Sequence, residues 1–301
     1  MVVMSMKVMI TGGAGFIGSH LTDALIQKGF DVHVVDDLSG GKKENVPAKA
    51  TLHVVSICDY DALQNLFTGV DFVFHLAALP RVQYSIEHPR ETSEVNVNGT
   101  LNVLLAAKEA GVKKVIYSAS SSAYGDTDAM PLREDMPANP ISPYALQKYI
   151  GELNCRLFST IYGLPTVSLR YFNVYGSRQD PTGPYALVIG RFLLMKREGK
   201  PLLITGDGTQ TRDFTHVRDV VHANILAMES SKVGKGEVIN IGAGQNRSIN
   251  EIAKNIGGAI EYIEKRIEPH DTLADISRAK ELLGWAPQVP FDQGIQELLS
   301  V

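Results

Sequence analysis

The chain has 301 residues, of which 44% are hydrophobic and 21% are charged, and this ordinary globular composition suits one large domain with a smaller lobe. The formal net charge is −4 and the basic residues form no run, so nothing points to nucleic acid or to an anionic membrane surface. No apolar run approaches the roughly 20 residues of a bilayer-spanning helix, and the short apolar start at 1–6 lacks a signal-peptide cleavage site, so we expect a cytoplasmic protein.

The cysteines and histidines show no pattern of a disulfide or a metal site. Cys58 and Cys155 lie far apart in the sequence, which predicts two free thiols in a reducing compartment. The eight histidines are scattered, and His216 and His222 do not share a helix face, so we expect no metal site.

The first predicted element carries a dinucleotide motif. An apolar run at 7–11 predicts a strand that ends in the turn Gly12-Gly13-Ala14-Gly15-Phe16-Ile17-Gly18, and a helix is predicted from there to Gly29. Glycines at these spacings allow a tight turn, close approach of backbone to a pyrophosphate, and close helix–strand packing. The helix N-terminus then presents its partial positive charge to the phosphates. A structural bend without a ligand is the alternative interpretation.

The second strand, predicted at 31–35, ends in Asp36. A carboxylate at this place accepts hydrogen bonds from an adenosine ribose diol and repels a 2′-phosphate. With the glycine turn, it favours a dinucleotide site over a structural bend, and NAD over NADP.

Strands and helices then alternate along the chain. Apolar strands are predicted at 51–56, 71–76, 113–118 and 165–170, and helices at 60–67 and 94–110. This rhythm predicts an α/β fold with a doubly wound parallel sheet covered by helices on both faces. Ligands in such sheets bind at the carboxyl ends of the strands, where Ala77 and the serines at 118–122 are expected to meet the glycine turn.

A helix that carries candidate catalytic side chains is predicted to begin at Ser142-Pro143-Tyr144-Ala145-Leu146-Gln147-Lys148. Serine is a good N-cap and proline fits the first helical position. Tyr144 and Lys148 lie four residues apart and therefore share a helix face. A cation beside a tyrosine favours its phenolate, so Lys148 is expected to lower the pKa of Tyr144, although a shift of about 3 units also needs an oxidised nicotinamide. The alternative is an amphipathic helix with an extended surface lysine.

After residue 172 the rhythm loosens, and helices are expected at 186–198 and 217–229 and strands at 202–204 and 237–241. Ser248 and Glu251 form a capping box that opens another helix. We expect a dinucleotide domain at 1–172 plus 216–242, and a smaller lobe at 173–215 plus 243–301.

Taken in order, these motifs resemble those of an extended short-chain dehydrogenase/reductase, specifically the UDP-sugar 4-epimerase branch (UDP-glucose or UDP-N-acetylglucosamine 4-epimerase). The resemblance covers nearly the whole chain: the glycine turn, Asp36, the serine run before Tyr124, the Tyr144/Lys148 helix, Tyr171-Phe172-Asn173 and Arg212-Asp213-Phe214. It implies a seven-stranded Rossmann sheet, a tightly held NAD, a nucleotide-sugar pocket in the C-terminal lobe, and a homodimer through a four-helix bundle of helices 94–110 and 144–161.

The resemblance also implies roles for individual residues. Tyr144 is the base, Ser120 relays the proton with Ser121 as a second candidate, and Lys148 binds the nicotinamide ribose. The implied cofactor contacts are Gly12, Gly15, Phe16, Ile17, Gly18, Asp36, Asp37, Ser39, Gly40, Ser56, Ile57, Leu76, Ala77, Ala78, Asn96, Ser118, Tyr144, Lys148, Tyr171 and Val174. The implied substrate contacts are Pro80, Arg81, Val82, Ser120, Ser121, Tyr144, Asn173, Tyr185, Val188, Leu203, Arg212, Arg266 and Thr272.

Three places depart from the family pattern. Ser56 stands where the family usually has an Asp near the adenine, and Pro80-Arg81 stands where some epimerases carry Lys. The usual Arg-Pro-Gly-acid segment is Arg266-Ile267-Glu268-Pro269, and the piece up to Thr272 is one residue short, which shifts the register of both assignments.

The reaction is narrowed by the serine run. Related dehydratases carry acidic residues before the Tyr-Gly pair, whereas positions 120–123 here read Ser-Ser-Ser-Ala, which leaves oxidation followed by return of the hydride, an epimerisation. A small residue at the position of Thr272 leaves room for an acetamido group, so we expect turnover of UDP-GlcNAc/UDP-GalNAc and of UDP-Glc/UDP-Gal. A UDP-glucuronate 4-epimerase, with Arg81 facing the uronate, and a catalytically silent NAD-binding regulator remain the alternatives.

Overall fold

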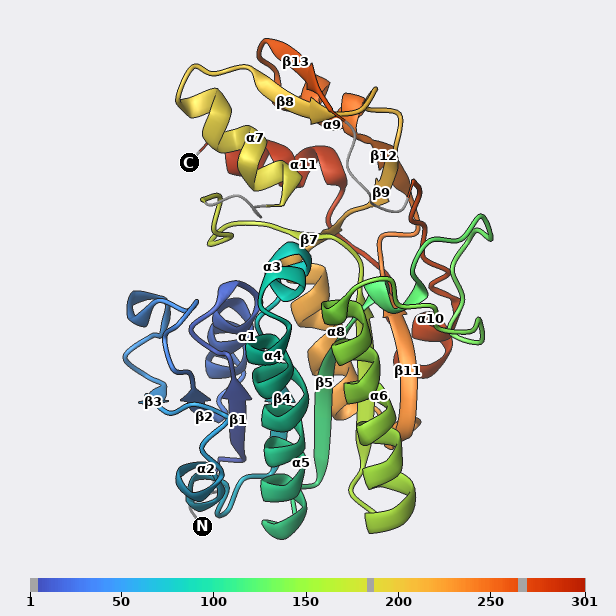
Figure 1. Cartoon of the computed structure of the whole chain (residues 1–301). Coiled ribbons are helices and arrows are strands. Elements are labelled where there is room, and N and C mark those ends of the chain that lie inside the picture. Colours follow the sequence, from blue (N-terminus) through green and yellow to red (C-terminus); the bar gives the residue numbers. More distant parts are fainter. Residues whose placement is uncertain (1–4, 183–186, 265–269, 301) are drawn as a thin grey trace.

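The computed structural model describes residues 5–182, 187–264 and 270–300. Within them, seven parallel strands form one sheet in the order β11-β6-β5-β4-β1-β2-β3 (Figure 1). The strands are β1 (Lys7–Thr11), β2 (Asp31–Val35), β3 (Thr51–His53), β4 (Phe72–His75), β5 (Lys114–Ser120), β6 (Thr166–Tyr171) and β11 (Lys235–Ile241). The predicted α/β class with a doubly wound Rossmann sheet is confirmed.

The pleat of β1 sends alternate side chains to two separate apolar cores. The helices beside the sheet are α1 (Phe16–Gln27), α2 (Tyr60–Leu66), α5 (Thr100–Glu109), α6 (Pro143–Tyr162), α8 (Val217–Glu229) and α10 (Ser277–Leu283). Val8 and Ile10 enter the core beneath α1, α8 and α10, and Met9 enters the core beneath α2, α5 and α6. Both faces of the sheet are therefore covered, and its ligand-binding edge lies at the carboxyl ends of the strands.

Short turns and helices complete this part of the chain. They are η1 (Lys43–Asn45), α3 (Val82–Glu87), α4 (Pro89–Ser93), the π-helix η2 (Glu94–Gly99) and η3 (Ser121–Tyr124). The helix predicted at 94–110 thus starts as a π-helix and becomes regular at Thr100, and the predictions contain no counterpart of α3 and α4.

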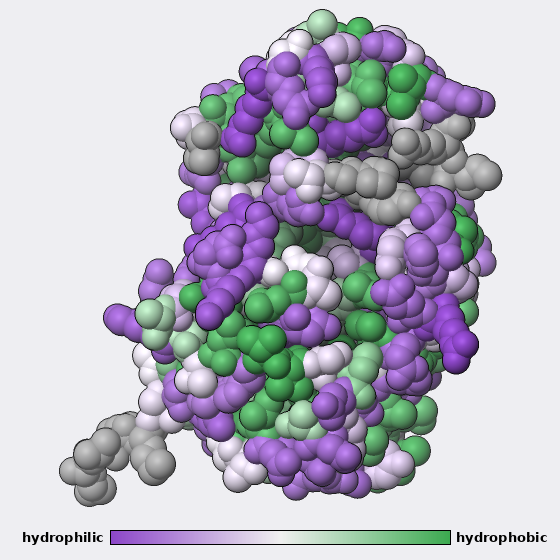
Figure 2. Space-filling view, turned by 60° about the vertical axis from the view of Figure 1, so that its left-hand side comes forward, coloured by the Kyte–Doolittle hydropathy of each residue, from purple (hydrophilic) through white to green (hydrophobic). Residues whose placement is uncertain are grey.

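The smaller lobe is built from short elements around its own core, which includes Phe192, Ile204, Ile252 and Ile295. Its two-stranded pairs are β10–β7, β12–β9 and β13–β8. The bounds are β7 (Val174–Tyr175), α7 (Val188–Arg197), β8 (Leu202–Thr205), β9 (Thr211–Asp213), β10 (Thr215–His216), β12 (Asn246–Ser248), α9 (Ile249–Ile256), β13 (Ile260–Ile263) and α11 (Phe291–Leu299). The predicted capping box of Ser248 and Glu251 opens α9 as expected. The surface is hollowed beneath the lobe (Figure 2).

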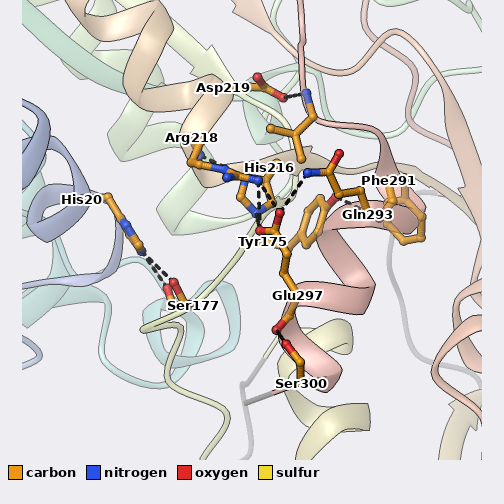
Figure 3. Close-up of polar contacts among 11 residues, drawn as sticks. His20, Tyr175, Ser177, His216, Arg218, Asp219, Phe291, Gln293, Glu297 and Ser300 are labelled. Atoms are coloured by element: carbon orange, nitrogen blue, oxygen red, sulfur yellow. Dashed lines mark hydrogen bonds and ion pairs between the residues drawn. The ribbon is translucent and has the colours of Figure 1, made fainter.

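A polar junction ties the lobe to the sheet (Figure 3). His216 caps α8 by accepting the backbone N–H of Arg218 at its Nδ1, 3.2 Å away, and is 5% exposed. The guanidinium of Arg218 donates to Glu297 of α11 at 2.7 Å. Burial, followed by the charge of Arg218, lowers the pKa of His216 to about 4, so the neutral ring is the form that fits this junction.

None of the described helices combines the length and apolar character needed to cross a bilayer. No group of three or more His, Cys, Asp or Glu that could hold a metal ion occurs within the described ranges.

Candidate active site

The glycine turn after β1 is a cradle of bare backbone. Gly12 has φ +73°, and a Cβ built on it would lie 2.6 Å from the backbone nitrogen of Ala77. A Cβ on Gly18 would collide with the carbonyl oxygen of Gly12. Helix α1 starts after Gly15 with no side-chain cap, so its first N–H groups are available to an anion. The turn therefore fits the pyrophosphate of a dinucleotide.

The carboxylate that follows β2 braces this cradle. Asp36 accepts the N–H of Ala14 at 2.9 Å and the N–H of Leu38 at 2.9 Å. Burial raises its pKa, and the two backbone hydrogen bonds oppose the shift. Next to it, the side chain of Asp37 accepts both the N–H and the hydroxyl of Ser39. Asp36 thus lies beside the glycine turn, where a ribose contact was expected.

The reactive groups gather at the ends of β5 and α6. Ser120 ends β5, and Tyr144 is the second residue of α6, whose cap is Ser142 with Pro143 in the first turn, as predicted. Burial raises the pKa of Tyr144 to about 12, although part of its surface stays accessible, and a hydrogen bond with Ser120 and the charge of Arg81 oppose that rise. The Tyr144 phenol therefore lies close enough to Ser120 and Arg81 for both to favour its ionised form.

The ammonium of Lys148 is held by groups at the end of β5. Its ammonium donates to the carbonyl of Ser118 at 2.8 Å and lies 5.0 Å from the centre of the Tyr117 ring. Burial lowers the pKa of Lys148 to about 8. The charge of Arg81 opposes the rise in the pKa of Tyr144, and the expectation that Lys148, with an oxidised nicotinamide, lowers that pKa remains a prediction.

A cavity of about 210 Å³ lies in the lobe, and Ser120, Tyr144 and Lys148 are not among the residues that line it. Its lining begins at Asn173, two residues after Tyr171, the strand partner of Ser120. Its lining includes the predicted substrate residues Asn173, Val188, Leu203 and Arg212, together with Val174, which was predicted as a cofactor contact. The guanidinium of Arg212 donates to the carbonyls of Thr211 and His270, at 2.8 and 2.9 Å, which fixes its direction.

Two distant segments meet at Asn173. This residue has φ +28°, a strained conformation for a non-glycine residue. Its amide donates to the carbonyl of Asp213 at 3.1 Å and to the hydroxyl of Thr272 at 3.3 Å. Thr272 is therefore held beside the pocket-lining Asn173, and its contact with a sugar remains a prediction. Tyr185 and Arg266, two further predicted substrate contacts, lie outside the described residues.

Other predicted cofactor residues are engaged with neighbouring protein groups. The N–H groups of Leu76 and Ala77 donate to the carbonyl and the hydroxyl of Thr11, at 3.0 and 3.3 Å, which sets the end of β4 beside the glycine turn. The hydroxyl of Tyr171 lies 2.9 Å from Asn224. The direct contacts of all these residues with NAD remain predictions.

The sequence analysis missed a buried amide network behind the site. Asn96 accepts the N–H of Leu79 at 2.8 Å and donates to its carbonyl at 3.1 Å and to Gln147 at 2.8 Å. Gln147 in turn donates to Thr92 at 3.0 Å. The amide of Asn96, predicted as a cofactor contact, is thus occupied in holding the loop before Arg81 against α6. No spacing rule reveals this network, because its members lie up to 68 positions apart.

Comparison with known proteins gives matches over most of the chain. Residues 8–242 match the model of the NAD dependent epimerase/dehydratase family. A putative UDP-glucose 4-epimerase of Methanocaldococcus jannaschii is 39% identical, with 97% of each chain covered. A UDP-N-acetyl-alpha-D-glucosaminuronate decarboxylase of Bacillus cytotoxicus is 38% identical, covering 99% of this chain and 98% of the relative.

Two solved structures share the whole fold. A UDP-N-acetylglucosamine 4-epimerase of Methanobrevibacter ruminantium, in complex with UDP-N-acetylmuramic acid, is 38% identical with a TM-score of 0.94, over 98% of this chain and 97% of the other. A UDP-glucuronic acid 4-epimerase of Bacillus cereus, in complex with UDP-glucuronic acid and NAD, is 34% identical with a TM-score of 0.90, over 98% of both chains.

Proposed function

Because the chain belongs to the NAD-dependent epimerase/dehydratase family, with NAD as its cofactor, we propose that it is a UDP-hexose 4-epimerase that interconverts UDP-GlcNAc and UDP-GalNAc, and also UDP-Glc and UDP-Gal. The observation that carries the proposal is the placement of Tyr144 close to Ser120 at the strand ends, together with a lobe cavity lined by Asn173 and Arg212 just beyond Tyr171, the strand partner of Ser120.

The serine turn separates epimerisation from the decarboxylation of the Bacillus cytotoxicus relative. Removing a carboxylate or a water molecule after oxidation needs further acid–base chemistry beside the sugar. Positions 120–123 carry three serines and an alanine, and none of them ionises at neutral pH. The groups at this turn therefore suit proton relay at one hydroxyl and nothing more.

The mechanism follows from the positions of the side chains. Tyr144, as phenolate, takes the proton of the sugar O4 and returns it at the end of the cycle, while Ser120 holds the same oxygen. Bound NAD would supply a hydride acceptor for C4 and a positive charge that favours the phenolate, and the 4-keto sugar would turn over in the pocket so that the hydride returns to its other face. Lys148 holds its ammonium at the end of β5, and Arg81 contributes positive charge from the opposite segment.

Substrate choice is assigned to the lobe. Arg212, directed by two carbonyls, suits a diphosphate because guanidinium donors match phosphate oxygens. Asn173 and Thr272 form one hydrogen-bonded wall, and the short side chain of Thr272 leaves space for an N-acetyl group. Both residues keep their conformation through hydrogen bonds to the backbone of Asp213.

A UDP-glucuronate 4-epimerase is the second candidate, and one observation favours it. The charge of Arg81 reaches the phenol of Tyr144, so it also reaches a sugar bound there, and a uronate carboxylate would gain from that charge.

The domain division and the assembly belong to the same proposal. We assign 1–172 with 216–242 to the dinucleotide domain and 173–215 with 243–301 to the lobe, except that Ala279, Leu283 and Trp285 pack into the core of the sheet, so 277–285 joins the first domain. The exposed Leu157 and Ile161 of α6, 49% and 65% accessible, suit the four-helix homodimer.

The test is a panel of UDP-GlcNAc, UDP-Glc and UDP-glucuronate incubated with purified protein, without added NAD, and followed by NMR of the sugar protons. We expect the 4-epimers of the first two. Epimerisation of the uronate alone would favour the second candidate, and release of carbon dioxide, or no product from any of the three, would contradict the proposal.

A further inference from the structure

The first turn of α6 is capped in an unusual way. A helix start leaves its first N–H groups without intrahelical partners. Pro143 has no N–H, and the N-cap Ser142 accepts the N–H of Ala145 at 3.2 Å. The N–H between them belongs to Tyr144, and it donates to the hydroxyl oxygen of Ser85, 3.0 Å away and 59 positions earlier in the chain. The backbone of the proposed base is thus held by a side chain from another helix.

Ser85 is fully buried and makes contacts in two directions. Its hydroxyl donates to the carbonyl of Val82 at 2.6 Å, so the same oxygen that accepts from Tyr144 also closes the first turn of α3. Its own N–H donates to the carbonyl of Arg81 at 2.9 Å. One hydroxyl therefore joins the Tyr144 backbone to the short helix that begins just after Arg81.

The buried amide network holds the same two segments together on either side of Ser85 in the sequence. Leu79 precedes α3 and is held by Asn96, which also donates to Gln147 of α6, and Thr92 follows α3 and accepts from Gln147. Segment 79–96 is thus fixed to the first two turns of α6 at several points, and Ser85 is the one that touches the residue carrying the phenol.

We propose that Ser85 is a positioning residue of the epimerase reaction, which sets the place of the Tyr144 phenol relative to Ser120 and Arg81. It does not touch the reacting atoms, and it acts through the backbone of Tyr144. The inference rests on the proposed function, because only an enzyme that uses Tyr144 as its base is sensitive to this placement. A displacement of about 1 Å at a reacting group is enough to slow a reaction up to roughly 100-fold.

The chain offers a matched control on the same helix. Ser159, near the other end of α6, donates its hydroxyl to the carbonyl of Gly234 at 2.8 Å, and it lies 15 positions from Tyr144. Ser159→Ala removes one serine hydrogen bond from α6, as Ser85→Ala does, but far from the site. Ser85→Cys keeps the shape of the side chain with a slightly larger atom and weakens its hydrogen bonds, so it covers the case in which the alanine variant does not fold.

The experiment measures kcat, KM and the pH profile of kcat for the wild type and these three variants, with UDP-GlcNAc or whichever UDP-sugar the wild type epimerises best. We expect kcat of Ser85→Ala and Ser85→Cys to fall about tenfold, with KM within about twofold. We also expect the acidic limb of the profile to move to higher pH, because a displaced phenol loses part of the stabilisation by Ser120 and Arg81. Ser159→Ala should keep the wild-type kcat and profile.

The outcomes separate the two claims. If the wild type is active and the Ser85 variants keep the kcat and the pH profile of Ser159→Ala, Ser85 is only a structural cap and the inference is wrong. A wild type without activity on any UDP-sugar contradicts the proposed function, and the role of Ser85 falls with it.

Discussion

The strand-end site and the lobe cavity are built in different ways. The strand-end groups Ser120, Tyr144 and Lys148 belong to two long elements, the strand β5 and the helix α6, which packs against it. The cavity is made from short elements, and its polar wall joins Asn173 to Thr272, which are 99 positions apart in the chain. One region is fixed by regular secondary structure and the other by contacts between distant loops.

This difference suggests a division of labour. Groups on long, buried elements keep an accurate geometry, which acid–base chemistry needs, whereas loop-borne groups can change without disturbing the sheet. We therefore expect changes at the strand ends to lower kcat, and changes in the lobe to alter KM or the choice of sugar.

Tyr144→Phe should have the largest effect. Loss of a general base typically costs about 10²–10⁴-fold in rate, so we expect kcat to fall by that factor. Binding of UDP, measured by calorimetry, should stay within about twofold of the wild type, because the lobe contacts are intact. Near wild-type epimerisation by this variant would contradict the assignment of Tyr144 as the base.

Arg212→Ala tests the other side of the comparison. Hydrogen bonds between charged groups contribute about 1.5–3 kcal/mol, so we expect KM for the UDP-sugar to rise about 10- to 100-fold with a small change in kcat. Steady-state kinetics with the best substrate of the panel measures both. A loss confined to kcat would break the assignment of binding to the lobe.

Thr272→Tyr sharpens the claim about sugar choice. A bulky side chain beside Asn173 should exclude the acetamido group and lower kcat/KM for UDP-GlcNAc by about 10- to 200-fold relative to UDP-Glc. Thr272→Ser, which keeps the hydroxyl that Asn173 and Asp213 contact, serves as the control. An unchanged preference in the tyrosine variant would place the sugar elsewhere.

His216→Asn concerns stability at the junction between the two regions (Figure 3). Because burial holds the pKa of His216 at about 4, below its ordinary value, the folded state loses stability as pH falls below about 6.5. Asparagine keeps a capping acceptor and does not titrate. Between pH 7 and pH 5, the free energy of unfolding measured with urea should therefore fall by up to about 2 kcal/mol less in the variant than in the wild type.

The same contrast explains what the sequence could predict. The cap of α6, the glycine turn and Asp36 are local patterns, and each lies where its pattern predicts, because neighbouring residues determine turns, caps and strand ends. The charge of Arg81 close to the Tyr144 phenol was not predicted. It depends on how the segment before α3 folds against α6, and no spacing specifies that.

Long-range contacts stayed hidden for a related reason. The Ser85 contact with Tyr144 and the Asn96 contact with Gln147 join residues 59 and 51 positions apart. Single polar residues of this kind are indistinguishable in sequence from surface ones until folding brings their partners together.

The most direct test of the account uses UDP-GlcNAc labelled with deuterium at C4 of the sugar. If Tyr144 removes the O4 proton and the hydride returns to the carbon it left, the UDP-GalNAc formed will keep the deuterium at C4. Loss of the label to water, or the absence of any 4-epimer from the labelled sugar and from unlabelled UDP-Glc, would contradict the account.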